Sequence, residues 1–114
     1  MDTKQQFLDV IQNEYLKIVG NNMPNDLLKV VCEAVADDRY HQYQRFTNDH
    51  PKSTKRYSSF QTKDLDHPWV FELVIKTLKK EVGAEYESYA MLLLKMSQNE
   101  LRDFERRMID FHNM

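Results

Sequence analysis

The chain has 114 residues, with 16 lysines and arginines against 18 acidic residues, so its net charge is −2 at neutral pH. This length, with 41% apolar and 30% charged residues, excludes a disordered chain and favours a single domain spanning residues 1–114. Two glycines and three prolines are too few for the turns of a β-rich fold. We therefore expect an all-α protein, a compact bundle of four or five helices with one long basic loop between the second and third helices.

The first predicted helix begins near Thr3 and ends at Gly20. Thr3 and Gln6 have the spacing of a capping box, in which each side chain bonds a free backbone N–H of the first turn. Gly20 is a common kind of helix stop, because glycine adopts the left-handed conformation without strain. Between these ends one apolar stripe recurs at helical spacing: Phe7, Val10, Ile11, Tyr15, Ile18 and Val19.

The second predicted helix begins within residues 22–25 and continues to about Asn48 or Pro51. Pro24 is tolerated in a first helical turn, and the residue before Pro51 is restricted away from helical geometry. The core face of this helix is formed by Leu27, Leu28, Val31, Ala34 and Val35. After it, residues 47–64 combine a proline, serines, threonines and many cations, which predicts the long loop.

Two further helices are predicted on either side of Gly83, which we expect to end the first of them. That helix begins at Asp66, acting as N-cap, with Pro68 in its first turn. Its apolar face is formed by Phe71, Val74, Ile75, Leu78 and Val82. The next helix covers residues 84–96 and is apolar almost all round near its end.

The last predicted helix begins at Ser97, which forms a second capping box with Glu100. Its apolar residues recur at a three-four spacing and make a narrow seam of the kind that packs on another helix: Leu101, Phe104, Met108 and Phe111. The partner is either another helix of the same chain or a second copy, so a homodimer through this seam is one of two alternatives.

Residues 39–63 combine positive charge with aromatic rings. Six lysines and arginines face one aspartate there, a net charge of +5, while both flanking parts of the chain are acidic. Cations neutralise phosphates and rings stack on bases, and tyrosine and arginine also anchor protein interfaces. The predicted binding residues are Arg39, Tyr40, Tyr43, Arg45, Lys52, Lys55, Arg56, Tyr57 and Lys63.

The leading interpretation is a small non-enzymatic binding or regulatory protein that acts on a macromolecular partner through this basic aromatic segment. A nucleic-acid-binding protein that uses the same segment is the first alternative, although the near-neutral total charge argues against it. A purely structural alternative is that the aromatic residues belong to the core, because aromatics at helical spacing are commonly buried.

Two arginine–histidine spacings offer a third interpretation. Arg45 precedes His50, and Arg107 precedes His112, each by five positions. This spacing resembles the arginine–histidine pair of HEPN-type RNases, which are small all-helical enzymes. The resemblance rests on these two residues at each site, and it implies that the arginine acts on the phosphate and the histidine on a proton.

No residue is assigned to catalysis, a metal or a cofactor from the sequence. Cys32 is the single cysteine, so no disulfide forms within the chain, and its apolar neighbours predict burial. Glu33, Asp37 and His41 share a helical face, but no second helix supplies matching ligands, so we expect a solvated acidic face. Without an apolar signal region or a long apolar run, we expect no membrane contact and a cytoplasmic location.

Overall fold

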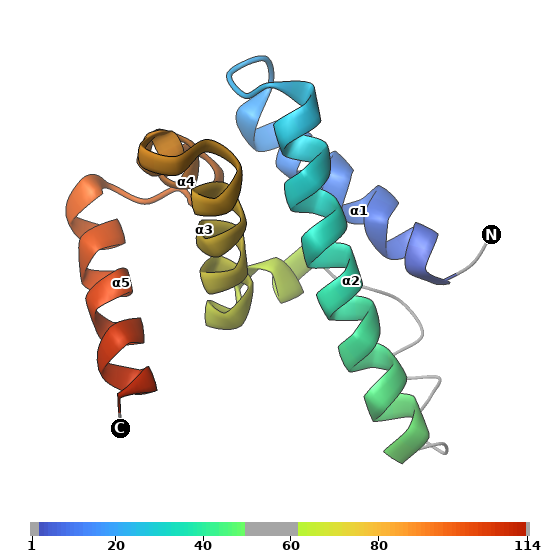
Figure 1. The fold of residues 1–114 in the computed structure, drawn as a ribbon. Helices are drawn as coiled ribbons and strands as arrows, with labels where there is room; N and C mark the ends of the chain where they lie inside the picture. The colour runs from blue at the N-terminus through green and yellow to red at the C-terminus, as the bar shows by residue number, and fades with distance from the viewer. Residues whose placement is uncertain (1–2, 50–61, 114) are drawn as a thin grey trace.

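The computed structural model describes residues 3–49 and 62–113, and within those ranges all regular elements are helices (Figure 1). The predicted all-α bundle is confirmed, with five α-helices and two short 3-10 helices in the described part of the chain. In chain order the elements are α1 (Thr3–Val19), α2 (Asn25–Asp49), η2 (Thr62–Asp66), α3 (Pro68–Val82), η3 (Gly83–Glu85), α4 (Tyr86–Leu94) and α5 (Gln98–His112).

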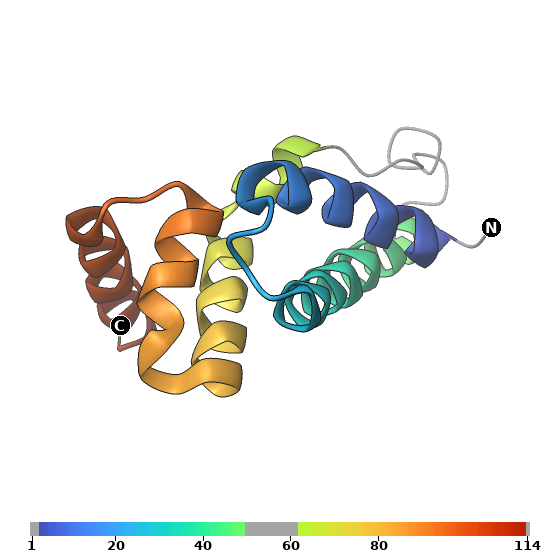
Figure 2. The same ribbon diagram turned by 90° about the horizontal axis from the view of Figure 1, so that it is seen from above.

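The first two helices and the last helix lie on opposite sides of the molecule (Figures 1 and 2). Helix α1 packs on α2, and α2 also contacts α3. Helix α3 contacts α4, which in turn contacts both α1 and α5, while η2 packs on α1 and α3. Helices α3 and α4 therefore connect the α1–α2 pair to α5.

Three of the predicted helix ends are confirmed by backbone geometry. Gly20 has φ of 53° and donates its N–H to the Leu16 carbonyl at 2.8 Å, while Gly83 ends α3 with φ of 61°. Both lie in the left-handed region, where a side chain would cause strain. At the start of α5, Ser97 Oγ accepts from the Glu100 N–H at 3.1 Å, and Glu100 Oε1 accepts from the Ser97 N–H at 3.2 Å.

The predicted N-cap of α3 is wrong by one residue. His67, rather than Asp66, caps the helix, because its Nδ1 accepts from the Trp69 N–H at 3.2 Å. An N-cap needs an extended backbone, which His67 has at φ −77° and ψ 137°. Asp66 is the last residue of η2 and is already part of a helical turn.

The boundaries of the fourth helix and of the long loop also differ from the prediction. Helix α4 is shorter than residues 84–96, because η3 precedes it and Lys95 ends it in the left-handed conformation with φ of 57°. The ends of the predicted loop 47–64 are helical, since α2 continues to Asp49 and η2 begins at Thr62. The rest of that loop, residues 50–61, lies outside the described residues.

Apolar side chains from all five α-helices form one buried cluster. Its most buried members are Ile11, Val19, Val31, Cys32, Val35, Val70, Val74, Leu78, Ala90, Leu93 and Leu101. No charged side chain is buried within the described ranges. Burial of apolar surface stabilises a fold by about 25 cal/mol per Å² removed from water, so this cluster is the main source of stability. None of the helices that the structure describes has the length and apolar character needed to cross a bilayer.

Candidate interaction surface

The structure describes five of the nine predicted binding residues. Arg39, Tyr40, Tyr43 and Arg45 follow one another along the second half of α2, and Lys63 lies in η2. The other four predicted residues lie outside the described ranges: Lys52, Lys55, Arg56 and Tyr57. Arg45 and Lys63 are exposed, whereas the two tyrosines and Arg39 are partly buried.

Tyr40 and Tyr43 pack on α1. Their ring centroids lie 6.0 and 5.6 Å from that of Phe7, both edge-on, and 6.1 Å from each other in a stacked arrangement. Phe7 is only 3% exposed, so the three rings close the α1–α2 interface near the start of α1. This contact matches the structural alternative for these two tyrosines, and their predicted role in partner binding stays untested.

Arg39 lines a cleft between α2 and α3. Its Nη2 and Nε donate to Asp38 Oδ2 at 2.6 and 3.0 Å, so its charge is already paired. The cleft, called the α2–α3 cleft below, has a volume of about 580 Å³. It is lined by Asp38, Arg39, Gln42, His67, Trp69, Glu72, Leu73 and Lys76.

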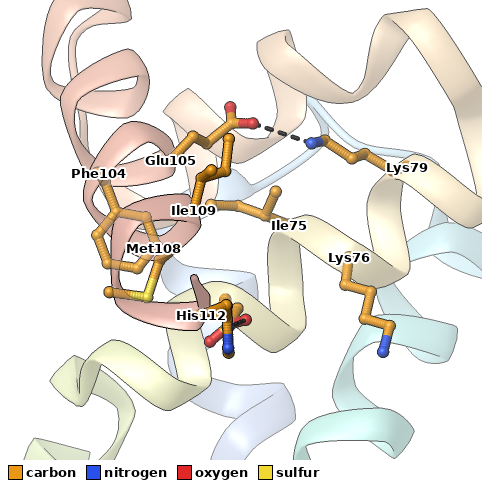
Figure 3. A pocket seen from close by; sticks show the side chains of 9 residues that line it. Ile75, Lys76, Lys79, Phe104, Glu105, Met108, Ile109 and His112 are labelled. Carbon is orange, nitrogen blue, oxygen red and sulfur yellow. Dashed lines mark hydrogen bonds and ion pairs between the residues drawn. The ribbon is translucent and has the colours of Figure 1, made fainter. Parts of the chain in front are cut away.

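A second hollow, called the α3–α5 groove below, lies between α3 and α5 and has a volume of about 320 Å³ (Figure 3). Its floor is apolar and comes from both helices: Ile75, Phe104, Met108 and Ile109. Charged and polar side chains surround this floor: Glu72, Lys76, Lys79, Glu105 and His112. Glu72 and Lys76 line both hollows, so this part of α3 forms the ridge between them.

One edge of the groove is closed by a network around Glu105. Lys79 Nζ lies 2.9 Å from Glu105 Oε2 (Figure 3), and the Tyr86 hydroxyl donates to Glu105 Oε1 at 2.8 Å. The Lys79 ammonium also lies 4.8 Å from the centre of the Tyr86 ring. Burial raises the pKa of the Tyr86 phenol to about 12, and the hydrogen bond to Glu105 acts in the same direction.

At the other end of the groove His112 contacts Glu72. Their Nε2 and Oε1 atoms are 2.5 Å apart, and this contact ties the end of α5 to α3. Lys76, one turn after Glu72, is exposed and extends away from α5 (Figure 3). Among the described residues that line the groove, Lys76 is the one charged side chain that makes no ion pair or hydrogen bond with another side chain.

Two exposed aromatic rings adjoin the same end of the groove. Trp69 is 51% exposed and Phe111 is 53% exposed, and their ring centroids lie 5.9 Å apart, edge-on. Trp69 also lines the α2–α3 cleft, and Phe111 stands next to His112 in the chain. On α5, Ile109 is 61% exposed over the groove itself. Large apolar side chains therefore meet solvent where the two hollows adjoin.

The sequence reasoning missed Trp69, Lys76 and Ile109. A signal for Trp69 was present, because it stands 100° round the helix from the stripe of Val70 and Val74. An apolar ring off the buried stripe of an amphipathic helix points toward solvent or toward a second partner. Nothing in the sequence showed that α5 would lie beside this face.

The predicted seam of α5 makes contacts within its own chain. Leu101 is 1% exposed and Phe104 is 6% exposed, and the Phe104 ring lies 5.9 Å from that of Phe71 on α3. Met108 is partly buried, and Phe111 meets Trp69. Of the two alternatives, packing on another helix of the same chain is therefore what the structure shows for the first half of the seam.

The residues of the RNase interpretation make separate contacts. Five positions along a helix correspond to a rotation of roughly 140°, which directs Arg107 and His112 to different sides of α5. His112 contacts Glu72, whereas Arg107 Nε donates to the Asp103 carbonyl at 3.4 Å. Arg45 is exposed on α2, and His50 lies outside the described residues.

The described residues show neither a reactive thiol nor a cluster of metal ligands. Burial raises the pKa of the Cys32 thiol to about 12, helped by the charge of Glu33, so the sulfur is a protonated, inert thiol at neutral pH. In the part of the chain that the structure describes, no three histidine, cysteine or acidic side chains come together as metal ligands would.

Neither the sequence nor the fold matched any protein-family model, curated protein or solved structure.

Proposed function

We propose that this is a non-enzymatic binding or regulatory protein whose partner is another protein. The observation that carries the proposal is the exposed Trp69–Phe111 pair, which stands where the α2–α3 cleft meets the α3–α5 groove. Single exposed apolar residues are normal on a protein surface, but an aromatic pair beside two hollows is typical of an interaction site. Tryptophan is also among the residues that contribute most to binding energy at interfaces.

Among the described residues of the basic aromatic segment 39–63, Arg39 lines the α2–α3 cleft, where it is paired with Asp38. Exposed cations at the edge of an interface steer and orient a charged partner more than they add affinity. Arg45 and Lys63 are exposed and remain predicted binding residues in this proposal. These two cations then extend the contact made by the aromatic pair, rather than forming the whole site.

The proposal is tested by replacing Trp69 with a photo-reactive benzophenone side chain in cells that produce the protein. The matched control carries the same group in place of Leu16, which is 50% exposed on α1 and lines neither hollow. We expect a discrete cross-linked protein at position 69 and none at position 16. Equal cross-linking at both positions would contradict the proposal.

The cross-linked partner is then purified and titrated into the unmodified protein. Trp69 is the single tryptophan of the chain, so its fluorescence reports on this surface alone, and binding should shift its emission to shorter wavelengths. Trp69→Ala should weaken binding by about tenfold or more, as expected for a central aromatic anchor, while Leu16→Ala should leave it unchanged. Equal affinities for the two variants would overturn the proposal.

Nucleic acid is the alternative partner, and a titration with labelled RNA and DNA at two salt concentrations tests it. Binding through phosphates falls steeply as salt rises, because bound counterions are released. A salt-dependent affinity that is lost in the double variant Arg45→Ala, Lys63→Ala would transfer the function to nucleic acid. Binding that is absent, or that is insensitive to salt, leaves the protein partner as the better proposal.

A homodimer is the remaining alternative for the α5 seam. Met108 is partly buried and Phe111 is half-exposed, so a second copy could still contact this end of the helix. Light scattering over a range of protein concentrations tests the idea directly. A monomer at high concentration would remove the homodimer and leave the surface to another protein.

A further inference from the structure

We infer that the α3–α5 groove binds an amphipathic helix of the partner protein, with apolar side chains on the groove floor and a carboxylate paired with Lys76. This inference rests on the proposed function and specifies the chemistry of its partner. It follows from the shape of the groove, from the state of the charges around it and from the aromatic pair at its end.

The shape of the groove suits a helix. Its walls are two neighbouring helices, and its apolar floor is supplied by Phe104 and Met108 at successive turns of α5 and by Ile75 on α3. Amphipathic helices are recognised in such grooves through apolar anchors three, four and seven positions apart. The Trp69–Phe111 pair continues the apolar surface beyond the floor.

The charges around the groove favour an acidic partner over a basic one. Glu105 is engaged by Lys79 and Tyr86, while Glu72 contacts His112 through Oε1 and its other oxygen, Oε2, is buried without a hydrogen-bond partner among the described residues. A lysine or arginine of a bound helix would therefore find no solvent-accessible carboxylate oxygen there that lacks a partner. Lys76 has no ion pair with any residue that the structure describes, and a carboxylate of the partner can pair with it.

The direction of the Lys76 side chain determines which side of the bound helix must carry the carboxylate. The side chain extends away from α5, on the ridge that the groove shares with the α2–α3 cleft (Figure 3). A helix seated on the apolar floor must therefore carry its acid on the flank that faces α2. An exposed ion pair of this kind changes affinity by up to about fivefold, so the apolar anchors supply most of the binding and Lys76 supplies the preference.

Two labelled peptides test the inference. Both are helix-stapled, about 14 residues long, and carry leucines at positions suited to the groove. One has glutamates on the flank of the leucine stripe and the other has lysines there. Fluorescence anisotropy should show that the wild-type protein binds the glutamate peptide more tightly, by about threefold to tenfold.

Three variants separate the apolar contribution from the charge. Lys76→Glu should reverse the preference in favour of the lysine peptide, because the like charges now repel the glutamate peptide. Lys29→Glu is the matched control, since it makes the same change in net charge on an exposed part of α2 that lines neither hollow. Ile109→Lys should abolish binding of both peptides, and because Ile109 is 61% exposed, this variant should keep the fold, as circular dichroism would verify.

The outcomes distinguish this inference from the proposed function. If neither peptide binds, or if Lys76→Glu and Lys29→Glu change the preference equally, the inference is wrong. The proposed function still stands in that case when cross-linking at position 69 captures a partner whose binding depends on Trp69. A concentration-dependent dimer that Ile109→Lys dissociates would also overturn the inference, because a second copy would then occupy the groove.

Discussion

Helices α1 and α5 carry apolar residues at the same three-to-four spacing, yet only α1 buries its stripe along the whole helix. On α1 the centre line of the stripe is buried from the first turns to the last, with Val10 and Ile18 partly buried beside it: Phe7, Ile11, Tyr15 and Val19. On α5 the stripe begins buried, with Leu101 and Phe104, and ends at Phe111, which is 53% exposed. The spacing of apolar residues therefore predicts which face of a helix is apolar, but not how much of that face is covered.

The difference comes from what lies beside each helix. Helix α1 has 17 residues and runs beside α2, which has 25 and so offers a full-length partner. Helix α5 lies beside α3, but the fully buried stripe of α3 already packs in the core with the other helices: Val70, Val74 and Leu78. What α3 offers to α5 is a second face, with Phe71 and Ile75 toward its middle and the exposed Trp69 at its start. Because this second face of α3 covers only part of α5, the α3–α5 groove remains between the two helices.

The largest expected effect is on the free energy of unfolding, when one aromatic ring of α1 and one of α5 are each replaced by alanine. Phe7→Ala should lower the free energy of unfolding by about 3–5 kcal/mol, because it removes a buried ring and leaves a cavity against Tyr40 and Tyr43. Phe111→Ala should lower it by less than about 1 kcal/mol, because that ring is half-exposed. Urea denaturation of both variants measures the two values. Similar losses would break the comparison between a covered and an uncovered stripe.

Local rules predicted most of the helix ends. The stops at Gly20 and Gly83 and the capping box at Ser97 depend on residues within one or two turns, so the sequence contained all the information they require. The N-cap of α3 was missed because η2 precedes it directly and takes Asp66 into its own turn. Which residue caps α3 depends on whether Asp66 belongs to the turn of η2 or to the start of α3, and the sequence is compatible with both.

The candidate surface could be predicted only in part. The positions of Arg39, Tyr40 and Tyr43 on one helix followed from the sequence, but the contact of both tyrosines with Phe7 depends on how α1 crosses α2. The α3–α5 groove joins residues about 30 positions apart, such as Ile75 and Met108, through the turn after α4. No periodic pattern in a single helix specifies such a juxtaposition, because it depends on packing between helices.

The attachment of α5 should depend on its cap as well as on its buried half. Ser97→Ala removes the hydrogen bond to the Glu100 N–H and should lower the free energy of unfolding by about 1 kcal/mol. Ser88→Ala is the matched control, because Ser88 is exposed within α4 and caps no helix. It should be neutral or slightly stabilising, since alanine has the higher helix propensity. Equal losses in the two variants would mean that the cap contributes nothing to holding α5.

A smaller effect should appear in the pH dependence of stability. The pKa of the Tyr86 phenol is raised from 10.0 to about 12 in the folded protein, so between these values the unfolded chain loses the proton first. The unfolded state then binds fewer protons than the native state, and the stability contributed by Tyr86 falls as pH rises from about 10 to about 12. Tyr86→Phe lacks this titration, so its unfolding free energy should decline less steeply over that window. Parallel declines in urea denaturation would show that the Tyr86–Glu105 contact does not hold α5 to the bundle.

The smallest effect concerns the uncovered end of α5, where His112 contacts Oε1 of the Glu72 carboxylate. Glu72 and Lys76 stand four positions apart on α3, a spacing at which glutamate and lysine attract each other by a few tenths of a kcal/mol. His112→Ala should free Glu72 to pair with Lys76 and should reduce the preference for the glutamate peptide by about twofold. The double variant His112→Ala, Glu72→Gln should restore that preference, because the competing carboxylate is gone. If the ratio of the two peptide affinities is the same in all three proteins, the charge of Lys76 is not controlled by the end of α5.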